Sequence, residues 1–78
     1  MRDPPCAAVS AQSAFGENMR RHRVKHRLTQ GQVAKRSGIS KSEISRLERG
    51  MRNPRLDTIV RVARGIGVAP SKLLTRIR

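Results

Sequence analysis

The sequence has very few aromatic residues, which limits the core that the chain can build. Phe15 is the only Phe, Trp or Tyr among 78 residues. The packing therefore depends on Leu, Ile, Val, Ala and Met. A chain of this length buries only ~60% of its unfolded surface, so one small domain is expected, and such a thin core favours association with a partner subunit.

Cysteine and long apolar runs are also scarce. Cys6 is the only cysteine, so the chain forms no internal disulfide and a cystine-stapled secreted fold is excluded. No apolar run approaches the ~20 residues that span a bilayer. The N-terminus has no basic segment followed by an apolar one, which a secretion signal requires. The sequence predicts a cytoplasmic protein.

Acidic residues are outnumbered by basic ones. The chain has 18 Lys and Arg against 5 Asp and Glu, a formal net charge of +13. Such a surface attracts polyanions, and nucleic acid is the favoured partner. An anionic membrane is the rival, because residues 19–28 (MRRHRVKHRL) form a basic segment, but that segment lacks the broad apolar face of an interfacial helix. A merely solvated basic surface is the third interpretation.

The apolar pattern predicts an all-α fold. Residues 1–14 have no sustained periodicity and are expected to be a flexible arm, followed by one domain over 15–78. Leu56, Ile59, Val60, Ala63 and Ile66 recur at helical spacing. Gly65 is expected to cost that helix roughly 0.5–1 kcal/mol. Helices are predicted over about 15–27, 30–37, 41–49, 56–66 and 70–77.

Residues 29–49 carry the pattern of a helix-turn-helix. Thr29 with Gln32, and Ser40 with Glu43, have the spacing of capping boxes at two helix starts. Gly38 lies between the helices, where a left-handed backbone turns the chain. A small residue, Ala34, four positions earlier allows a close helix crossing. Apolar side chains are expected to face the core from both helices: Val33, Ile39, Ile44 and Leu47.

The stretch LTQGQVAKRSGISKSEISRLERG, followed by RNP and LDTIVRVARGIGV, resembles the Cro/phage-repressor type (XRE family) of helix-turn-helix regulators. The resemblance covers about residues 15–74. Small stand-alone members, including the controller proteins of restriction-modification systems, are of similar size. The resemblance implies a five-helix DNA-binding domain whose helix beginning at Ser40 lies in the major groove of double-stranded DNA.

The same resemblance implies which side chains contact bases. Lys41, Ser42 and Arg46 occupy the positions that the family uses for base readout, and arginine can bind guanine O6 and N7 together. For the cations the alternative is a phosphate contact. Glu43 is interpreted first as a cap and second as an acceptor from cytosine. Ser45 is expected near a phosphate or the base edges.

Phosphate contacts are expected at the two ends of the motif. Thr29 and Gln30 begin the second helix, where free N–H groups favour a phosphate. Related proteins use this glutamine to hold the DNA backbone and to support the recognition helix. The cluster that follows the third helix is also expected to bind phosphates, and a solvated turn is the alternative. Its members are Arg49, Arg52, Asn53 and Arg55. The resemblance also implies an ion pair between Arg23 and Glu48, with an orienting role.

The first functional hypothesis is a homodimer that binds a palindromic operator, with half-sites ~34 Å apart. Its dimer interface is expected within residues 56–78, on Val60, Ile66, Leu73, Leu74 and Ile77. An antitoxin that binds a toxin and autoregulates its operon, and a non-specific nucleic-acid binder, are the alternatives. No catalytic arrangement, metal site or small-molecule site is expected, because His22 and His26 supply at most half of a metal site. No cofactor is predicted.

Overall fold

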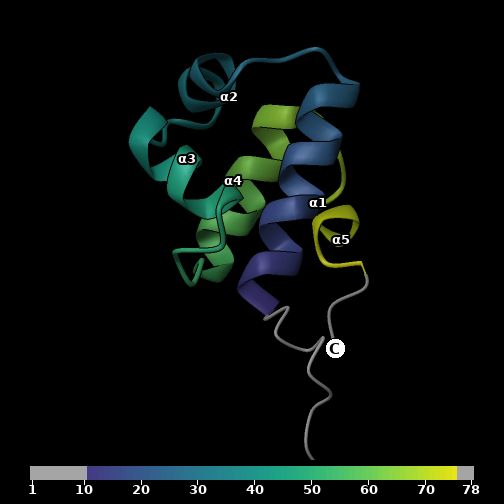
Figure 1. Ribbon diagram of the computed structural model, residues 1–78. Coiled ribbons are helices and arrows are strands. Elements are labelled where there is room, and N and C mark those ends of the chain that lie inside the picture. Colours follow the sequence, from purple (N-terminus) through teal and green to yellow (C-terminus); the bar gives the residue numbers. More distant parts are fainter. Residues whose placement is uncertain (1–10, 76–78) are drawn as a thin grey trace, which may run out of the picture.

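The computed structural model describes residues 11–75, and these residues confirm the all-α fold (Figure 1). No strand is present within them. None of the helices in this part is long and apolar enough to cross a membrane. The five helices are α1 (Ala11–Lys25), α2 (Gln30–Ser37), α3 (Lys41–Glu48), α4 (Leu56–Ile66) and α5 (Pro70–Leu73).

Helix α1 begins four residues earlier than predicted, so a flexible arm is wrong for residues 11–14. This first turn contains no large apolar residue, but it is half-buried beyond Ala11 and packs against the turn after α3. There, a Cβ on Gly50 would lie 2.8 Å from the Ser13 hydroxyl oxygen. Residues 1–10 lie outside the described part. The other end of α1 closes at Arg27, whose φ of 58° is left-handed.

The core is a single cluster of nine side chains from all five helices. One member of the apolar repeat predicted for residues 56–66 does not enter the core: Leu56, the first residue of α4, is 75% exposed. Val62 is fully buried instead. The nine buried side chains are Phe15, Met19, Val33, Ile44, Leu47, Val62, Ala63, Ile66 and Leu73.

Two glycines permit close helix crossings. A Cβ on Gly16 of α1 would lie 2.5 Å from the carbonyl oxygens of both Leu47 and Glu48, which no real side chain tolerates. A Cβ on Gly65 of α4 would lie 3.0 Å from the Cβ of Ser37 at the end of α2. The propensity cost expected for Gly65 therefore has a packing benefit, since the glycine lets α4 approach α2.

Asn18 is a buried polar residue that fixes the end of the chain to α1. Its amide nitrogen donates to the carbonyl oxygens of Leu73 at 2.9 Å and Thr75 at 2.7 Å, while its oxygen accepts from Arg21 at 2.7 Å. The Leu73 carbonyl is one of the C-terminal groups that α5 leaves unpaired, and Thr75 lies two residues beyond the helix, so the amide caps this end of α5. This arrangement holds α5 against α1.

The predicted dimer interface needs correction at two positions. Ile66 and Leu73 are 1% and 0% exposed, because both face the core of their own chain, and neither has surface to offer a second copy. Leu74 is 42% exposed and Val60 is half-buried. Ile77 lies outside the described residues.

Candidate nucleic-acid interface

The start of α2 has the predicted capping box. The Thr29 hydroxyl accepts from the Gln32 N–H at 3.0 Å, and the Gln32 side chain accepts from the Thr29 N–H at 2.8 Å. At the other end, Gly38 has a φ of 77° and donates its N–H to the Ala34 carbonyl. The turn into α3 therefore uses the left-handed conformation that glycine adopts without a steric penalty.

The predicted capping box of α3 is only half formed. The Ser40 hydroxyl accepts from the Glu43 N–H at 3.2 Å, as expected. The Glu43 carboxylate, however, accepts from Arg52 Nε at 3.2 Å and lies 4.0 Å from Arg46 Nη1. The interpretation of this carboxylate as a helix cap is therefore wrong. It ties α3 to the turn that follows it and lies beside a predicted base-reading arginine.

Helix α3 has two distinct faces. Ile44 and Leu47 are fully buried and hold the helix against the core. Lys41, Ser42 and Arg46 are exposed and contribute nothing to that core. Ser45 is half-buried. The three residues that the sequence assigns to base readout are therefore free to meet a ligand, while the opposite face fixes the position of the helix.

An ion pair fixes the orientation of α3 relative to α1 and α2. Arg23 donates to both carboxylate oxygens of Glu48, with 3.1 Å between Nη2 and Oε1, so the predicted pair is confirmed. The pair is shielded from solvent, since the two side chains are 14% and 4% exposed. Gln30 Nε2 donates to the same carboxylate at 3.1 Å. One carboxylate thus joins three helices, and Gln30 supports α3.

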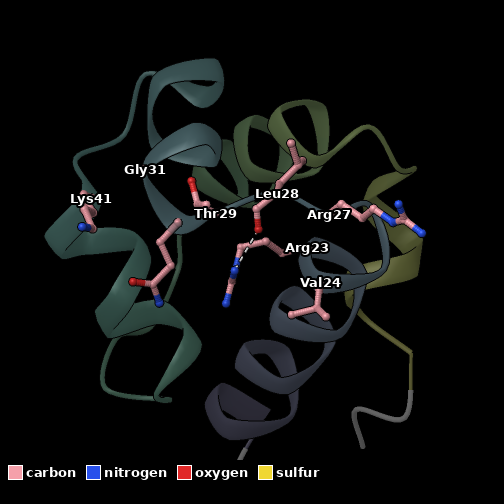
Figure 2. Close-up of a pocket in the computed structure, with 8 residues that line it drawn as sticks. Arg23, Val24, Arg27, Leu28, Thr29, Gly31 and Lys41 are labelled. Carbon is pink, nitrogen blue, oxygen red and sulfur yellow. Dashed lines mark hydrogen bonds between the residues drawn. The ribbon is translucent and has the colours of Figure 1, made fainter.

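A shallow basic hollow lies at the start of α2 (Figure 2). Its lining brings the residues that begin α2 together with Lys41 from the start of α3. Free N–H groups and the positive end of the α2 dipole favour an anion there. The lining residues are Arg23, Val24, Arg27, Leu28, Thr29, Gln30, Gly31 and Lys41.

Sequence reasoning missed Arg27 as a candidate phosphate contact. The residue is exposed, lines this hollow and holds a left-handed φ of 58°, where glycine is more usual at a helix end. The available signal was its position, directly between the basic segment of α1 and the cap of α2. Arg23 hydrogen-bonds the Leu28 carbonyl at 2.9 Å, which fixes this connection.

The basic turn after α3 is exposed, as a phosphate-binding segment must be. All four of its predicted contact residues, Arg49, Arg52, Asn53 and Arg55, are accessible. Arg52 is the one whose side chain is held, through its bond to Glu43. Within residues 11–75, no three His, Cys, Asp or Glu side chains gather in a way that could hold a metal ion.

A capped helix pair with a buried and an exposed face on its second helix defines the helix-turn-helix class of DNA-binding domain. Residues 19–73 match the family model described as Helix-turn-helix, and the chain belongs to this family. It is a DNA-binding transcription regulator of the helix-turn-helix type.

Two relatives and one solved structure extend the match beyond the motif. The chain is 43% identical over 60 residues to the HTH-type transcriptional regulator y4dJ of Sinorhizobium fredii, covering 77% of this chain and 78% of that protein. It is 33% identical over 76 residues to the control protein C.SmaI of Serratia marcescens, covering 97% and 90%. The crystal structure of the restriction-modification controller protein C.AhdI from Aeromonas hydrophila superposes with a TM-score of 0.77 at 32% identity, covering 80% and 94%.

Proposed function

We propose that this protein is a homodimeric regulator that reads a palindromic operator with α3 in the major groove. The observation that carries the proposal is the division of α3 into a buried face and an exposed polar face, held in place by the Arg23–Glu48–Gln30 network. A helix that reads bases must be fixed by its back while its front stays free. Both conditions are met here.

Roles at the DNA follow from side-chain chemistry. Arg46 is proposed to bind a guanine through O6 and N7, and Lys41 to contact a base edge or a phosphate nearby. Ser42 and Ser45 supply hydroxyl contacts. Glu43 is proposed to orient its arginine neighbours. Phosphates are bound by the N-terminal turn of α2 with Thr29, Gln30 and Arg27, and by the turn after α3 with Arg49, Arg52, Asn53 and Arg55.

The two-fold interface is proposed at an apolar groove beside α4 and α5. Leu74 lines it together with Phe15 and Ile59. Leu56 is 75% exposed, the most exposed large apolar side chain among the described residues. Val60 is half-buried on the same helix. Exposed leucines next to an apolar groove suit contact with a second copy of the same surface.

The relatives support a narrower role in the control of a restriction-modification system. The match to C.SmaI spans nearly the whole of both chains, and C.AhdI has a similar fold at similar size. We propose a controller-type regulator on this basis. An antitoxin role needs a toxin partner. Non-specific binding predicts no preferred DNA site, and the selection experiment described next tests that alternative directly.

Selection of bound sites from random duplex DNA at ~150 mM salt is expected to yield a palindrome. Arg46→Ala should lose the preference for one guanine in each half-site, because the bidentate contact is worth about 1–3 kcal/mol per base. Arg64→Ala, which removes an exposed arginine from α4, is the matched control and should keep the full site. Absence of any enriched site in the unchanged protein contradicts the proposal.

Replacing Leu74 with glutamine is expected to weaken the dimer by a factor of ten or more. Burial of one leucine stabilises by about 1.5–3 kcal/mol, and each 1.4 kcal/mol is tenfold in Kd. Sedimentation equilibrium at micromolar concentration measures the change. Val24→Gln is the control, since Val24 is 56% exposed but lies away from the groove. Equal effects of the two substitutions exclude this interface.

A further inference from the structure

A second group of cations lies on the side of α1 that faces away from α3. Arg23 points toward Glu48 of α3, as their ion pair shows. Each residue turns a helix by about 100°, so Arg21 and Lys25, two positions before and after Arg23, lie on the opposite side. Figure 1 shows α5 on that side of α1. Arg21, Lys25 and Lys72 of α5 are all exposed, and we name them the α1–α5 patch.

The α1–α5 patch is organised by hydrogen bonds. Buried Asn18 accepts from Arg21 at 2.7 Å and donates to the Leu73 carbonyl next to Lys72, so Arg21 is held beside α5. The pKa of the neighbouring His22 is lowered, first by burial and then by the positive charges of Arg21, Lys25, His26 and Lys72. Each of these positive charges therefore lies near the His22 ring.

Among residues 11–75, no carboxylate forms an ion pair with a residue of the patch. Three of the four described acidic residues form ion pairs elsewhere, and Glu17, one turn before Arg21 on α1, forms none. The three cations of the patch therefore have no ion-pair partner among the described residues, and an anion is the ligand that suits them. The paired acidic residues are Glu43 with Arg52 and Arg46, Glu48 with Arg23, and Asp57 with Arg61.

We propose that the α1–α5 patch binds the phosphate backbone of a second DNA duplex, so that the protein bridges two DNA segments. A two-fold interface centred on the patch would place it against itself, and because like charges repel, a second copy is a poor occupant. A protein partner normally needs an apolar anchor, and the three patch residues supply none. A DNA backbone offers closely spaced negative charges that lysine and arginine bind through counterion release.

The test uses a biotinylated duplex that carries the selected site, held on beads, and a labelled duplex without the site. The R21Q/K25Q/K72Q variant should retain about tenfold less labelled duplex than K35Q/R36Q/R64Q, a control with the same loss of charge at other exposed positions. Both variants should bind the bead duplex equally. Loss of three phosphate contacts should reduce the slope of log retention against log salt by about 2–3.

A second variant, K25Q/K72Q, leaves the bond from Arg21 to Asn18 in place, and thermal unfolding checks that each variant is folded. Equal retention by the patch variant and the charge-matched control overturns the proposal. The proposal is also overturned if Arg46→Ala reduces the retention of the labelled duplex and the patch variant does not. The second duplex would then be held by a partner's recognition helix. Binding to the bead duplex reports separately on the proposed function. Bridging is also measured between two random duplexes, so that the test of the patch does not depend on the proposed recognition of a specific site.

Discussion

Replacing Gly16 with alanine is expected to reduce the free energy of unfolding by about 3 kcal/mol, because the added methyl group has no room. Its Cβ would lie 2.5 Å from the carbonyl oxygens of Leu47 and Glu48, which are backbone atoms at the end of α3. Helices α1 and α3 would have to separate, and the core between them would open. For a domain of this size, the expected fall in Tm is roughly 12 °C or more, measured by circular dichroism.

Gly31→Ala is the matched control. Gly31 lies in the first turn of α2, and a Cβ there would meet only the Thr29 hydroxyl oxygen, at 3.8 Å. Alanine should therefore raise the free energy of unfolding by about 0.5 kcal/mol through its better helix propensity. If Gly16→Ala and Gly31→Ala unfold at the same temperature, the close crossing of α1 and α3 is refuted.

Removing the Glu48 carboxylate by substitution with alanine is expected to cost about 3 kcal/mol of unfolding free energy. The loss leaves the Arg23 guanidinium, 14% exposed, with only the Leu28 carbonyl as a hydrogen-bond partner. The Gln30 amide also loses its acceptor. Chemical denaturation measures the change, and urea midpoints of the two proteins should differ while their m-values agree.

The double variant R23M/E48M distinguishes the stability cost of an unpaired buried charge from the stability cost of lost packing. Because both ends of the ion pair are replaced with apolar side chains, most of the stability should return. An unfolding free energy as low as that of Glu48→Ala alone would show that the cost came from lost packing and not from the unpaired arginine. Operator affinity of the stable double variant then reports whether the pair orients α3 for DNA.

The helix-turn-helix could be predicted from sequence because its signals are local. Thr29 and Gln32 are three residues apart, and Gly38 marks the turn by its own backbone preference. The Arg23–Glu48 pair was also found, through the family resemblance. The resemblance also identified Lys41, Ser42 and Arg46, which are exposed on α3. Short-range chemistry determines the cap and the turn, whereas the Arg23–Glu48 pair joins residues 25 apart and was predicted only from the resemblance.

Features that depend on distant parts of the chain were missed. Asn18 bonds to carbonyls 55 and 57 residues later, so nothing near it in the sequence distinguishes it from a solvent-facing polar residue. Gly16 is required by a helix that begins 25 residues downstream. Helical periodicity also does not separate an apolar residue that faces the core from one that faces a partner, which is why Ile66 and Leu73 were wrongly assigned to the dimer interface.

The two faces of α3 have a consequence for the evolution of binding specificity. Lys41, Ser42 and Arg46 are exposed, so substitutions there change the surface proposed to contact DNA with little effect on folding. Ile44 and Leu47, one or two positions away, tolerate almost no change in volume. A duplicated gene could therefore acquire a new target sequence in a few mutational steps and remain stable at each of them.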